Sequence, residues 1–458
     1  MRPTIINPVT SEEETILRHA GNALAALARS DKTALQYYEG RQTVQHLGLA
    51  LPSSLRTLET VVNWPRIVVD TIEERQDVKS ILVPSHPEAA GDLQALMDAN
   101  DLNSELCMWR RDRLIFGRGY LSVGPGDTPD DYPVIRVEPP RQMTVHYDAR
   151  RQRIEYAVRM WEVEDDDGRT TRYAVIHRPT STVTLVTVGG KWTVADRDLH
   201  NLGAVPVVAS FNRQMTGETL GHSEMADIMG ITDAAVRAVT EMQVALETTA
   251  VPKRIIAGAS KSDFASPDAW FNYLSPFVAL KNPSARVTQL SPGELTNFHA
   301  TIELYGKLAS SLTGFPARYF GLITTNPPAE GAIRAEEAKL VKRVERVNAE
   351  CGAALSRVLT LAARLMGHTV PMGAVNVVWH DPATPTFSQK ADALQKLAGG
   401  KPLISREGAW DELGWDDARK AQEREYFDRE DRDPELERLL AKTMSGADTG
   451  ADDADRAP

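Results

Sequence analysis

Residues 221–247 read GHSEMADIMGITDAAVRAVTEMQVALE, and this stretch guides the interpretation of the rest of the chain. Its apolar residues recur at steps of three and four, the period of one face of an α-helix: Met225, Ile228, Ile231, Ala235, Val239, Met242 and Leu246. Another face carries charges four residues apart that can pair: Asp233, Arg237 and Glu241. Gly230 predicts an early break in this helix. The stretch therefore predicts a helical region with one packed side and one charged side.

The next segments predict an insert followed by a second amphipathic helix. Residues 251–290 are rich in proline and in short strand-like runs, VPKRIIAG and FVALKNPSARVTQL. Residues 291–314 begin with SPGE, which is typical of a capped helix start, and Gly314 is suited to end the helix. The apolar stripe of this second helix contains Leu295, Phe298, Ile302, Tyr305, Leu308 and Leu312.

A loop and a very long helix follow. Residues 315–331 hold prolines and glycines that break regular structure at both ends. Residues 332–366 form the longest helical pattern in the chain, closed by Gly367. A short apolar strand is expected at 375–379. Further helices are expected at 387–398, 405–413 and 416–442, before a small, acidic tail at 443–458 that should be disordered.

The first half of the chain divides into helices and then strands. Helices are expected from Ser11 onward and at about 54–74 and 89–116, with Pro65 breaking or kinking the first of these two stretches. Between 117 and 210 the hydrophobic pattern alternates, and Gly189-Gly190 is typical of a hairpin turn. The whole sequence therefore predicts a mainly helical α+β protein of several domains.

Composition limits the function classes. The chain has 458 residues and a formal net charge of −11, whereas a protein that grips DNA by its phosphates is normally basic. Its two cysteines, Cys107 and Cys351, cannot build a disulfide framework or a metal cluster. No apolar run is long enough to span a membrane, and the first residues lack the apolar core of a signal peptide.

Motifs for catalysis are missing. The sequence contains no G-x-x-x-x-G-K-[ST], H-E-x-x-H or G-x-S-x-G motif, and its histidines lack metal-ligand spacing. One acidic cluster, Asp411-Glu412 with Asp416-Asp417, could be considered for a two-metal nuclease. Acids at the start of a helix are also favoured by the helix dipole, and we prefer that interpretation. No enzymatic activity, cofactor or metal is expected.

Several segments in a fixed order carry a family resemblance. They are LQYYEGRQTVQHLG (35–48), VVNWPRIVVDTIEER (61–75), LIFGRGYLSVG (114–124), VPVVASFNR (205–213), the stretch at 221–247, SSLTGFPARYFG (310–321) and WHDP (379–382) with PLISREGAWDELGW (402–415). This ordered set, covering roughly residues 30–440, resembles the portal proteins of long-tailed bacteriophages. No single segment is diagnostic of that family.

The resemblance implies a division of the chain into the parts of a portal subunit. Residues 1–116 would be a helical wing and 117–212 a β-rich wing. The first stem helix would lie in 213–250, the clip in 251–290 and the second stem helix in 291–314. The remaining parts would be the tunnel loop (315–331), the long spine helix with its return strand (332–385), the crown (386–442) and the tail (443–458).

The resemblance also implies sites and partners. A ring of about twelve subunits at one capsid vertex would pass double-stranded DNA during packaging, retention and ejection, and would join head to tail. Expected partners are further copies of this chain, the terminase large subunit, head-completion or adaptor proteins, and the major capsid and scaffolding proteins. The ring would assemble in the host cytoplasm and function in the virion, with no membrane.

Particular residues can be assigned to these expected roles. Contact with the channel is expected for Leu322, Ile323, Thr324, Thr325, Asn326, Lys339, Lys342 and Arg346. The basic residues on α-helix 332–366 could instead pair with acids of the same helix. Partner docking is expected at Lys253, Arg254, Lys261, Lys281 and Arg286, and stem packing at Ile228, Val239, Phe298, Ile302 and Leu308. The alternatives are a metal-dependent DNA-processing enzyme and another oligomeric connector or minor capsid protein.

Overall fold

The protein is described here from a computed structural model. The described residues are 8–42, 62–126, 128, 131–148, 150, 153–164, 168–250, 254–258, 284, 286–289, 296–322, 330–383, 387–398, 402–415 and 417–430. The chain forms two compact units, Met1–Pro382 and Ala383–Pro458.

Four helices lie in the part of the chain before residue 117 that the structure describes. Helix α1 (Ser11–Glu39) begins at a reciprocal capping box, in which Thr10 accepts from the Glu13 amide and Glu13 accepts from the Thr10 amide. Helix α2 (Trp64–Glu73) begins with proline in its first turn, so Pro65 starts a helix and does not kink one. The single helix expected at 89–116 is wrong. It is divided into α3 (Pro87–Ala99) and α4 (Leu102–Phe116), because Asp101 adopts a left-handed φ of 47°.

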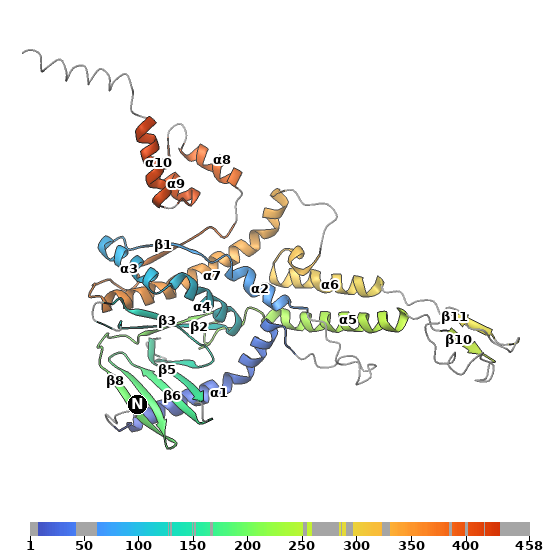
Figure 1. Ribbon diagram of the computed structural model, residues 1–458, viewed down its shortest axis with the longest axis horizontal. Coiled ribbons are helices and arrows are strands. Elements are labelled where there is room, and N and C mark those ends of the chain that lie inside the picture. Colours follow the sequence, from blue (N-terminus) through green and yellow to red (C-terminus); the bar gives the residue numbers. More distant parts are fainter. Residues whose placement is uncertain are drawn as a thin grey trace, which may run out of the picture. The chain divides into compact units, whose positions relative to one another are not determined.

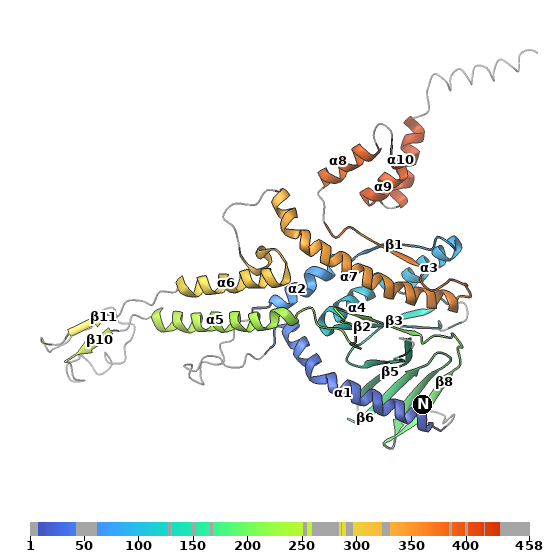
Figure 2. The ribbon, with the colours of Figure 1, turned by 180° about the vertical axis from the view of Figure 1, so that it is seen from behind.

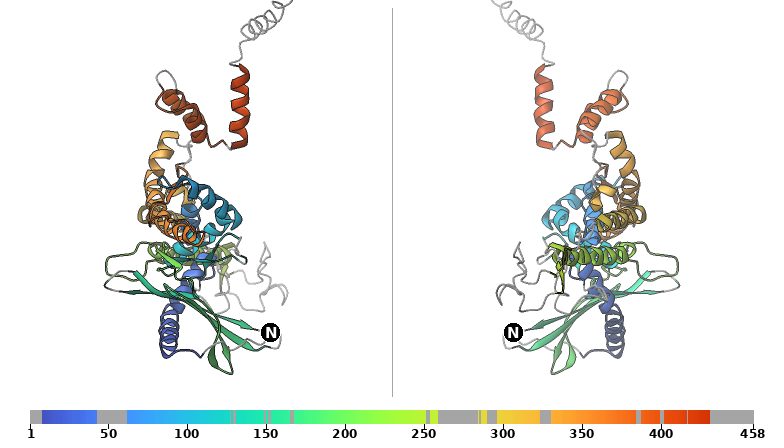
Figure 3. Two further views of the ribbon diagram at one scale, coloured as in Figure 1. Left: turned by 90° about the vertical axis from the view of Figure 1, so that its left-hand side faces the viewer. Right: turned by 90° about the vertical axis from the view of Figure 1, so that its right-hand side faces the viewer.

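A five-stranded antiparallel meander confirms the alternating pattern of the sequence. Its strands, in order, are β4 (Met143–Asp148), β5 (Arg153–Glu164), β6 (Thr170–His177), β7 (Thr182–Val188) and β8 (Lys191–Asp198). Gly189 and Gly190 form the β7–β8 turn with φ of 58° and 78°, which glycine adopts without strain. Helix α1 lies against one face of this sheet (Figures 1 and 3), where Ile16, Leu17 and Ala20 are buried.

Two smaller sheets join segments that are far apart in the sequence. Strand β2 (Arg118–Gly124) lies between β3 (Val134–Glu138) and β9 (Val207–Phe211), and all pairs are antiparallel. Strand β1 (Val78–Leu82), which the sequence pattern did not reveal, pairs with β12 (Asn376–Trp379). The expected return strand therefore exists, and its partner comes from the beginning of the chain.

The long helix α7 (Glu330–Leu365) crosses the main hydrophobic core, as the sequence predicts. Its buried side includes Leu340, Val344, Cys351, Leu355, Val358 and Leu359. It packs on the β3-β2-β9 sheet and contacts α3 as well. Gly367, with a φ of 88°, follows its end.

Helices α5 (Ala226–Ala250) and α6 (Thr296–Thr313) lie side by side in Figures 1 and 2. Gly230 does not break α5, so that expectation is wrong: a single glycine inside a helix costs only about 0.5–1 kcal/mol, and the helix continues through it. The described part of the segment between them contains an antiparallel hairpin of β10 (Arg254–Ala257) and β11 (Arg286–Gln289).

The described residues of the second unit form three short helices, α8 (Phe387–Ala398), α9 (Arg406–Leu413) and α10 (Asp417–Glu430). Ser405 caps α9, and the buried Trp410 stacks on Trp415 and Phe427 with centroids 5.8 Å away in each case. The helix starts agree with the sequence pattern. Lys420 forms an ion pair of 2.6 Å with Asp411, so this acid already has a cationic partner.

Candidate functional site

Helices α5 and α6 contact each other, and the buried positions of α6 carry small side chains. On α6 the buried positions are Gly306, Ala309 and Thr313, which lie on one side of the helix. A Cβ atom at Gly306 would come within 3.2 Å of the Leu322 side chain, so glycine gives that side chain room. Leu322, predicted to face a channel, is half-buried against α6. This packing holds the segment after α6 against the helix pair.

The predicted stem residues differ in burial. Ile228 is fully buried, and Val239, Phe298 and Ile302 are half-buried. Leu308 is 44% exposed. Burial of Leu308 therefore cannot come from this chain alone, and its predicted contact with a neighbouring subunit stays a prediction.

Helix α6 presents a line of exposed leucines. Leu304, Leu308 and Leu312 are 53%, 44% and 54% exposed, and their spacing of four residues places them on one side of the helix. Leu246 of α5 is also 43% exposed. Scattered exposed leucines are ordinary, but an ordered line of them is typical of a surface that another protein covers. We call the three residues of α6, Leu304, Leu308 and Leu312, the leucine line.

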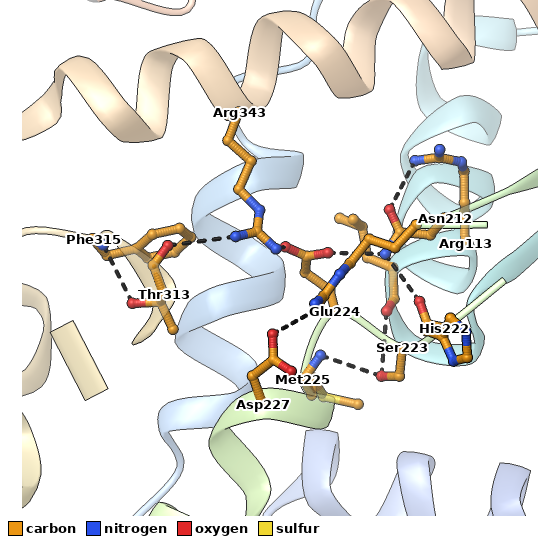
Figure 4. A network of polar contacts seen from close by, with 12 residues as sticks. Arg113, Asn212, His222, Ser223, Glu224, Met225, Asp227, Thr313, Phe315 and Arg343 are labelled. Atoms are coloured by element: carbon orange, nitrogen blue, oxygen red, sulfur yellow. Dashed lines mark hydrogen bonds and ion pairs between the residues drawn. The ribbon is translucent and has the colours of Figure 1, made fainter. Parts of the chain in front are cut away.

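A buried carboxylate, Glu224, lies immediately before α5 (Figure 4). It forms an ion pair with Arg343 of α7, and its other oxygen accepts a hydrogen bond of 2.9 Å from the Asn212 side-chain amide. Its backbone amide donates to the Leu114 carbonyl at the end of α4, at 2.8 Å. The start of α5 is therefore tied to α4, to the residue after β9 and to α7.

A buried arginine extends this network. Arg113 of α4 donates to the Ser210 hydroxyl at 3.0 Å, to the Phe211 carbonyl at 2.7 Å and to the Asn212 side chain at 3.3 Å. It also forms an ion pair with Glu350 of α7. Because a buried charge needs such partners, these bonds fix where α4, β9 and α7 meet. We call the whole network the Glu224 junction.

Two glycines make the close approach at the junction possible. A Cβ atom at Gly221 would lie 2.2 Å from the Asn212 carbonyl oxygen and 2.4 Å from the Gly117 carbonyl oxygen. Gly117 itself has a φ of 74°, which side chains disfavour. Only glycine therefore fits at Gly221 without moving the backbone.

The segment after α6 is anchored at its beginning. Gly314 ends α6 with a φ of 74°, and the Ser310 hydroxyl donates to the Phe315 carbonyl at 2.7 Å. A 3-10 helix, Ala317–Phe320, follows, and Phe320 packs edge-on against Trp64 with a centroid distance of 5.8 Å. The expected tunnel loop thus begins with a packed portion. The rest of its predicted contact residues, namely Ile323, Thr324, Thr325 and Asn326, lie outside the described residues.

Both ends of this loop are held by one polar cluster. Arg318 forms ion pairs with Glu336 and Glu337 at the start of α7, and Arg75 pairs with Glu337 at 3.5 Å. The Tyr319 hydroxyl donates to Glu337 at 3.1 Å. The chain therefore leaves α6 and enters α7 at fixed points.

The basic residues of α7 do not all pair within their helix. Lys342 pairs with Glu345 at 2.6 Å, as the alternative interpretation expected, but Arg343 pairs with Glu224. Lys339 and Arg346 are exposed and form no ion pair with any residue that the structure describes. They keep a positive charge available near the start of α7.

The structure describes only two of the five predicted docking residues. Arg254 and Arg286 lie on the two strands of the β10–β11 hairpin, and Arg286 is exposed. Lys253, Lys261 and Lys281 lie outside the described residues.

Within the described ranges, no three His, Cys, Asp or Glu side chains come together in a way that could hold a metal ion. None of the helices in these ranges is both long and apolar enough to cross a membrane. What the described geometry offers is a packed helix pair, a charged junction and an uncovered leucine line.

Comparison with known proteins shows which family this sequence matches. A family model described as "Phage portal protein, SPP1 Gp6-like" matches residues 29–435. A portal protein of Mycobacterium phage D29 is 34% identical over 410 residues, covering 86% of this chain and 84% of that protein. A portal protein of Mycobacterium phage L5 is 32% identical over 461 residues, covering 97% and 93%.

Solved structures show a more distant likeness. A chain of the virion of a native gene transfer agent particle has a TM-score of 0.48 and 16% identity, covering 84% of this chain and 93% of that chain. A chain from the neck of the native particle, computed with C12 symmetry, has a TM-score of 0.44 and 17% identity, covering 77% and 88%.

Proposed function

Because this chain belongs to the family of phage portal proteins of the SPP1 Gp6-like type, we propose that it forms the ring through which DNA enters and leaves the capsid. The family is structural, and the proposed role is a conduit with no chemistry of its own. The ring would occupy one capsid vertex, contain about twelve subunits and join head to tail. It would assemble in the host cytoplasm and act in the virion.

The leucine line on α6 is the observation that supports this ring most directly. A cyclic ring uses two different faces of each subunit, and each face must be complementary to the other. Leu304, Leu308 and Leu312 project from α6 on a side that α5 does not cover. Fully burying an exposed leucine side chain contributes about 1.5–3 kcal/mol; these three are already about half covered, so burying the rest would contribute about 1 kcal/mol for each of them around the ring.

The Glu224 junction supports the same proposal. Channel helices that contact moving DNA must keep their positions relative to the wing. The buried ion pairs of Glu224 and Arg113 connect α5 to α4, β9 and α7 at one place. This connection would transmit forces between the stem and the rest of the subunit.

The remaining parts take the roles that the resemblance implies. The β10–β11 hairpin would be part of the clip, where Lys253, Arg254, Lys261, Lys281 and Arg286 would meet the terminase large subunit and later head-completion proteins. Residues 323–326 would face double-stranded DNA. The net charge of −11 per subunit would repel phosphate, so DNA would slide without sticking.

Imaging and sedimentation of the purified chain test the ring. Wild type should give rings with an axial hole in negative stain. Leu308→Asp should give mainly single subunits, because a carboxylate would be buried without a partner at every interface. Leu308→Met, which keeps the volume and the apolar character, is the matched control and should still form rings. A monomeric wild type would contradict the ring, and rings formed by Leu308→Asp would contradict the role of the leucine line.

A further inference from the structure

Four basic residues form a line along the exposed side of α7. Lys339, Arg346, Arg357 and Arg364 are separated by steps of 7, 11 and 7 residues. At about 100° per residue these steps bring all four within ~20° of one another around the helix, over a length of ~37 Å. None forms an ion pair with a residue inside the described ranges. We call this set the basic line.

The line is open to a partner at its C-terminal half. Arg357 and Arg364 line a cleft of about 1120 Å³ between α7, α1, the β4–β5 hairpin and β9. Acidic residues also line this cleft, but Glu12 is paired with Arg178 at 3.2 Å, and Glu155 is 3.8 Å from His146. Asp148 lies in the wall as well.

Glu350, the one acid on the same side of α7, is already paired with the buried Arg113. Among the described residues, no acid therefore forms an ion pair with the basic line.

The same chain carries an acidic surface of matching charge. Between residues 80 and 109 the sequence contains no Lys or Arg. The acids of this stretch lie on α3, before α4 and in the first turn of α4: Glu88, Asp92, Asp98, Asp101 and Glu105. Of these, Asp92 is paired with His368 at 2.8 Å. In the edge-on views of Figure 3, α7 lies toward one side of the first unit and α3 toward the other. We call these five residues the acidic surface.

We propose that the basic line of one copy binds the acidic surface of the next copy in the ring. This inference rests on the proposed function, because it assumes a ring of identical subunits. A heterologous contact needs two different complementary faces on each chain, and opposite charges on the two sides of one unit meet that requirement. Such pairing fixes the register of neighbours and excludes wrong ones.

A second copy fits the basic line better than nucleic acid does. The partner surface is present on the same chain, and it carries a similar number of charges of opposite sign. A chain with a net charge of −11 would repel a long polyanion, whereas a local contact between two oppositely charged faces is unaffected by the overall sign.

Charge reversal of each face separately is the first half of the test. Arg357→Glu with Arg364→Glu makes the cleft end of the line acidic, and Glu88→Arg with Glu105→Arg makes the other face basic. Each double variant should need a protein concentration about tenfold or more higher than wild type for half-assembly, a defect that salt should reduce. The control, Arg172→Glu with Lys191→Glu, makes the same net charge change as Arg357→Glu with Arg364→Glu, at exposed positions on β6 and β8, and should assemble as wild type does.

Mixing the two defective variants is the second half. Alternating subunits would then have matched charges at every contact, so an equimolar mixture should restore rings. Thermal unfolding of each variant checks that the subunits are folded.

Normal rings from either double variant, or no rescue in the mixture of folded variants, would overturn the proposal. Loss of binding to a short DNA duplex by Arg357→Glu with Arg364→Glu, with rings intact, would also overturn it in favour of nucleic acid. If wild type itself formed no rings, the proposed function would fail first.

Discussion

The Glu224 junction can be tested by removing a single cation. Arg343→Met keeps the length of the side chain but removes the guanidinium that pairs with Glu224. The Glu224 side chain is 1% exposed, so its carboxylate cannot be solvated by water. Apart from Arg343, the structure gives this side chain one hydrogen bond, from Asn212 to the other carboxylate oxygen.

The expected cost follows from this burial. Breaking a buried ion pair by removing one partner destabilises a protein by about 3–5 kcal/mol. Arg343 also donates to the Thr313 carbonyl at 3.4 Å, and losing that bond adds up to about 1 kcal/mol. Replacing Glu224 by Gln in the same chain removes the unpaired charge and should recover most of the loss. The coupling energy between the two positions should be about 2 kcal/mol.

Urea unfolding at one fixed protein concentration measures these free energies. The matched control is Lys342→Met, because Lys342 is the preceding residue on α7 and its ion pair with Glu345 is exposed. An exposed pair contributes about 0–1 kcal/mol. If Arg343→Met shifted the unfolding midpoint no more than Lys342→Met does, or if Glu224→Gln failed to compensate, the buried ion pair of Arg343 and Glu224 would not stabilise the fold.

Three further substitutions test other parts of the structure. Gly221→Ala should destabilise the chain by several kcal/mol in urea unfolding, because its Cβ would lie 2.2 Å from the Asn212 carbonyl oxygen; a wild-type midpoint would contradict this close approach. Gly230→Ala should instead stabilise the chain by about 0.5–1 kcal/mol, because this helical glycine has open space around it, and a loss of stability would show that the site is crowded. Burial, with the positive charges of His200 and Arg159, lowers the pKa of the His177 imidazole from 6.5 to about 4. The His177 imidazole therefore takes up a proton more readily in the unfolded chain than in the folded one. The free energy of unfolding should fall as the pH falls from 6.5 to about 4. His177→Gln should reduce that fall in thermal melts, and an unchanged pH dependence would refute the assignment.

The sequence predicted those elements whose signals are local. The long helix, the β7–β8 turn at Gly189-Gly190 and the three short helices of the second unit agree with the pattern. Helical and strand periods depend on residues a few positions apart, so they can be read without knowing the fold. The two local errors also have local causes. Asp101 adopts a left-handed conformation that divides one predicted helix, and a single glycine such as Gly230 costs a helix only about 0.5–1 kcal/mol.

The candidate site could be predicted only in part. Helices α5 and α6 and the basic residues of α7 were predicted from the sequence, but the roles of Glu224 and Arg113 were not. Neither residue has a local signal: each is one charged residue among many in the sequence. Leu308 was grouped with Phe298 and Ile302 by spacing, yet the structure leaves it exposed. The spacing of apolar residues predicts only roughly which face of a helix is buried. The neighbouring elements decide which residues of that face are covered.

By itself the sequence determined the mainly helical α+β character, the order of the helices and strands, and the family resemblance, because these depend on local patterns and on their order. Only the tertiary structure decided which distant residues meet. Arg113 and Glu350 pair across 237 positions, and β1 pairs with β12 although the two strands lie near opposite ends of the first unit. A charge or an edge strand has many possible partners in a sequence, and it is the packing of the core around α7 that brings one of them within bonding distance.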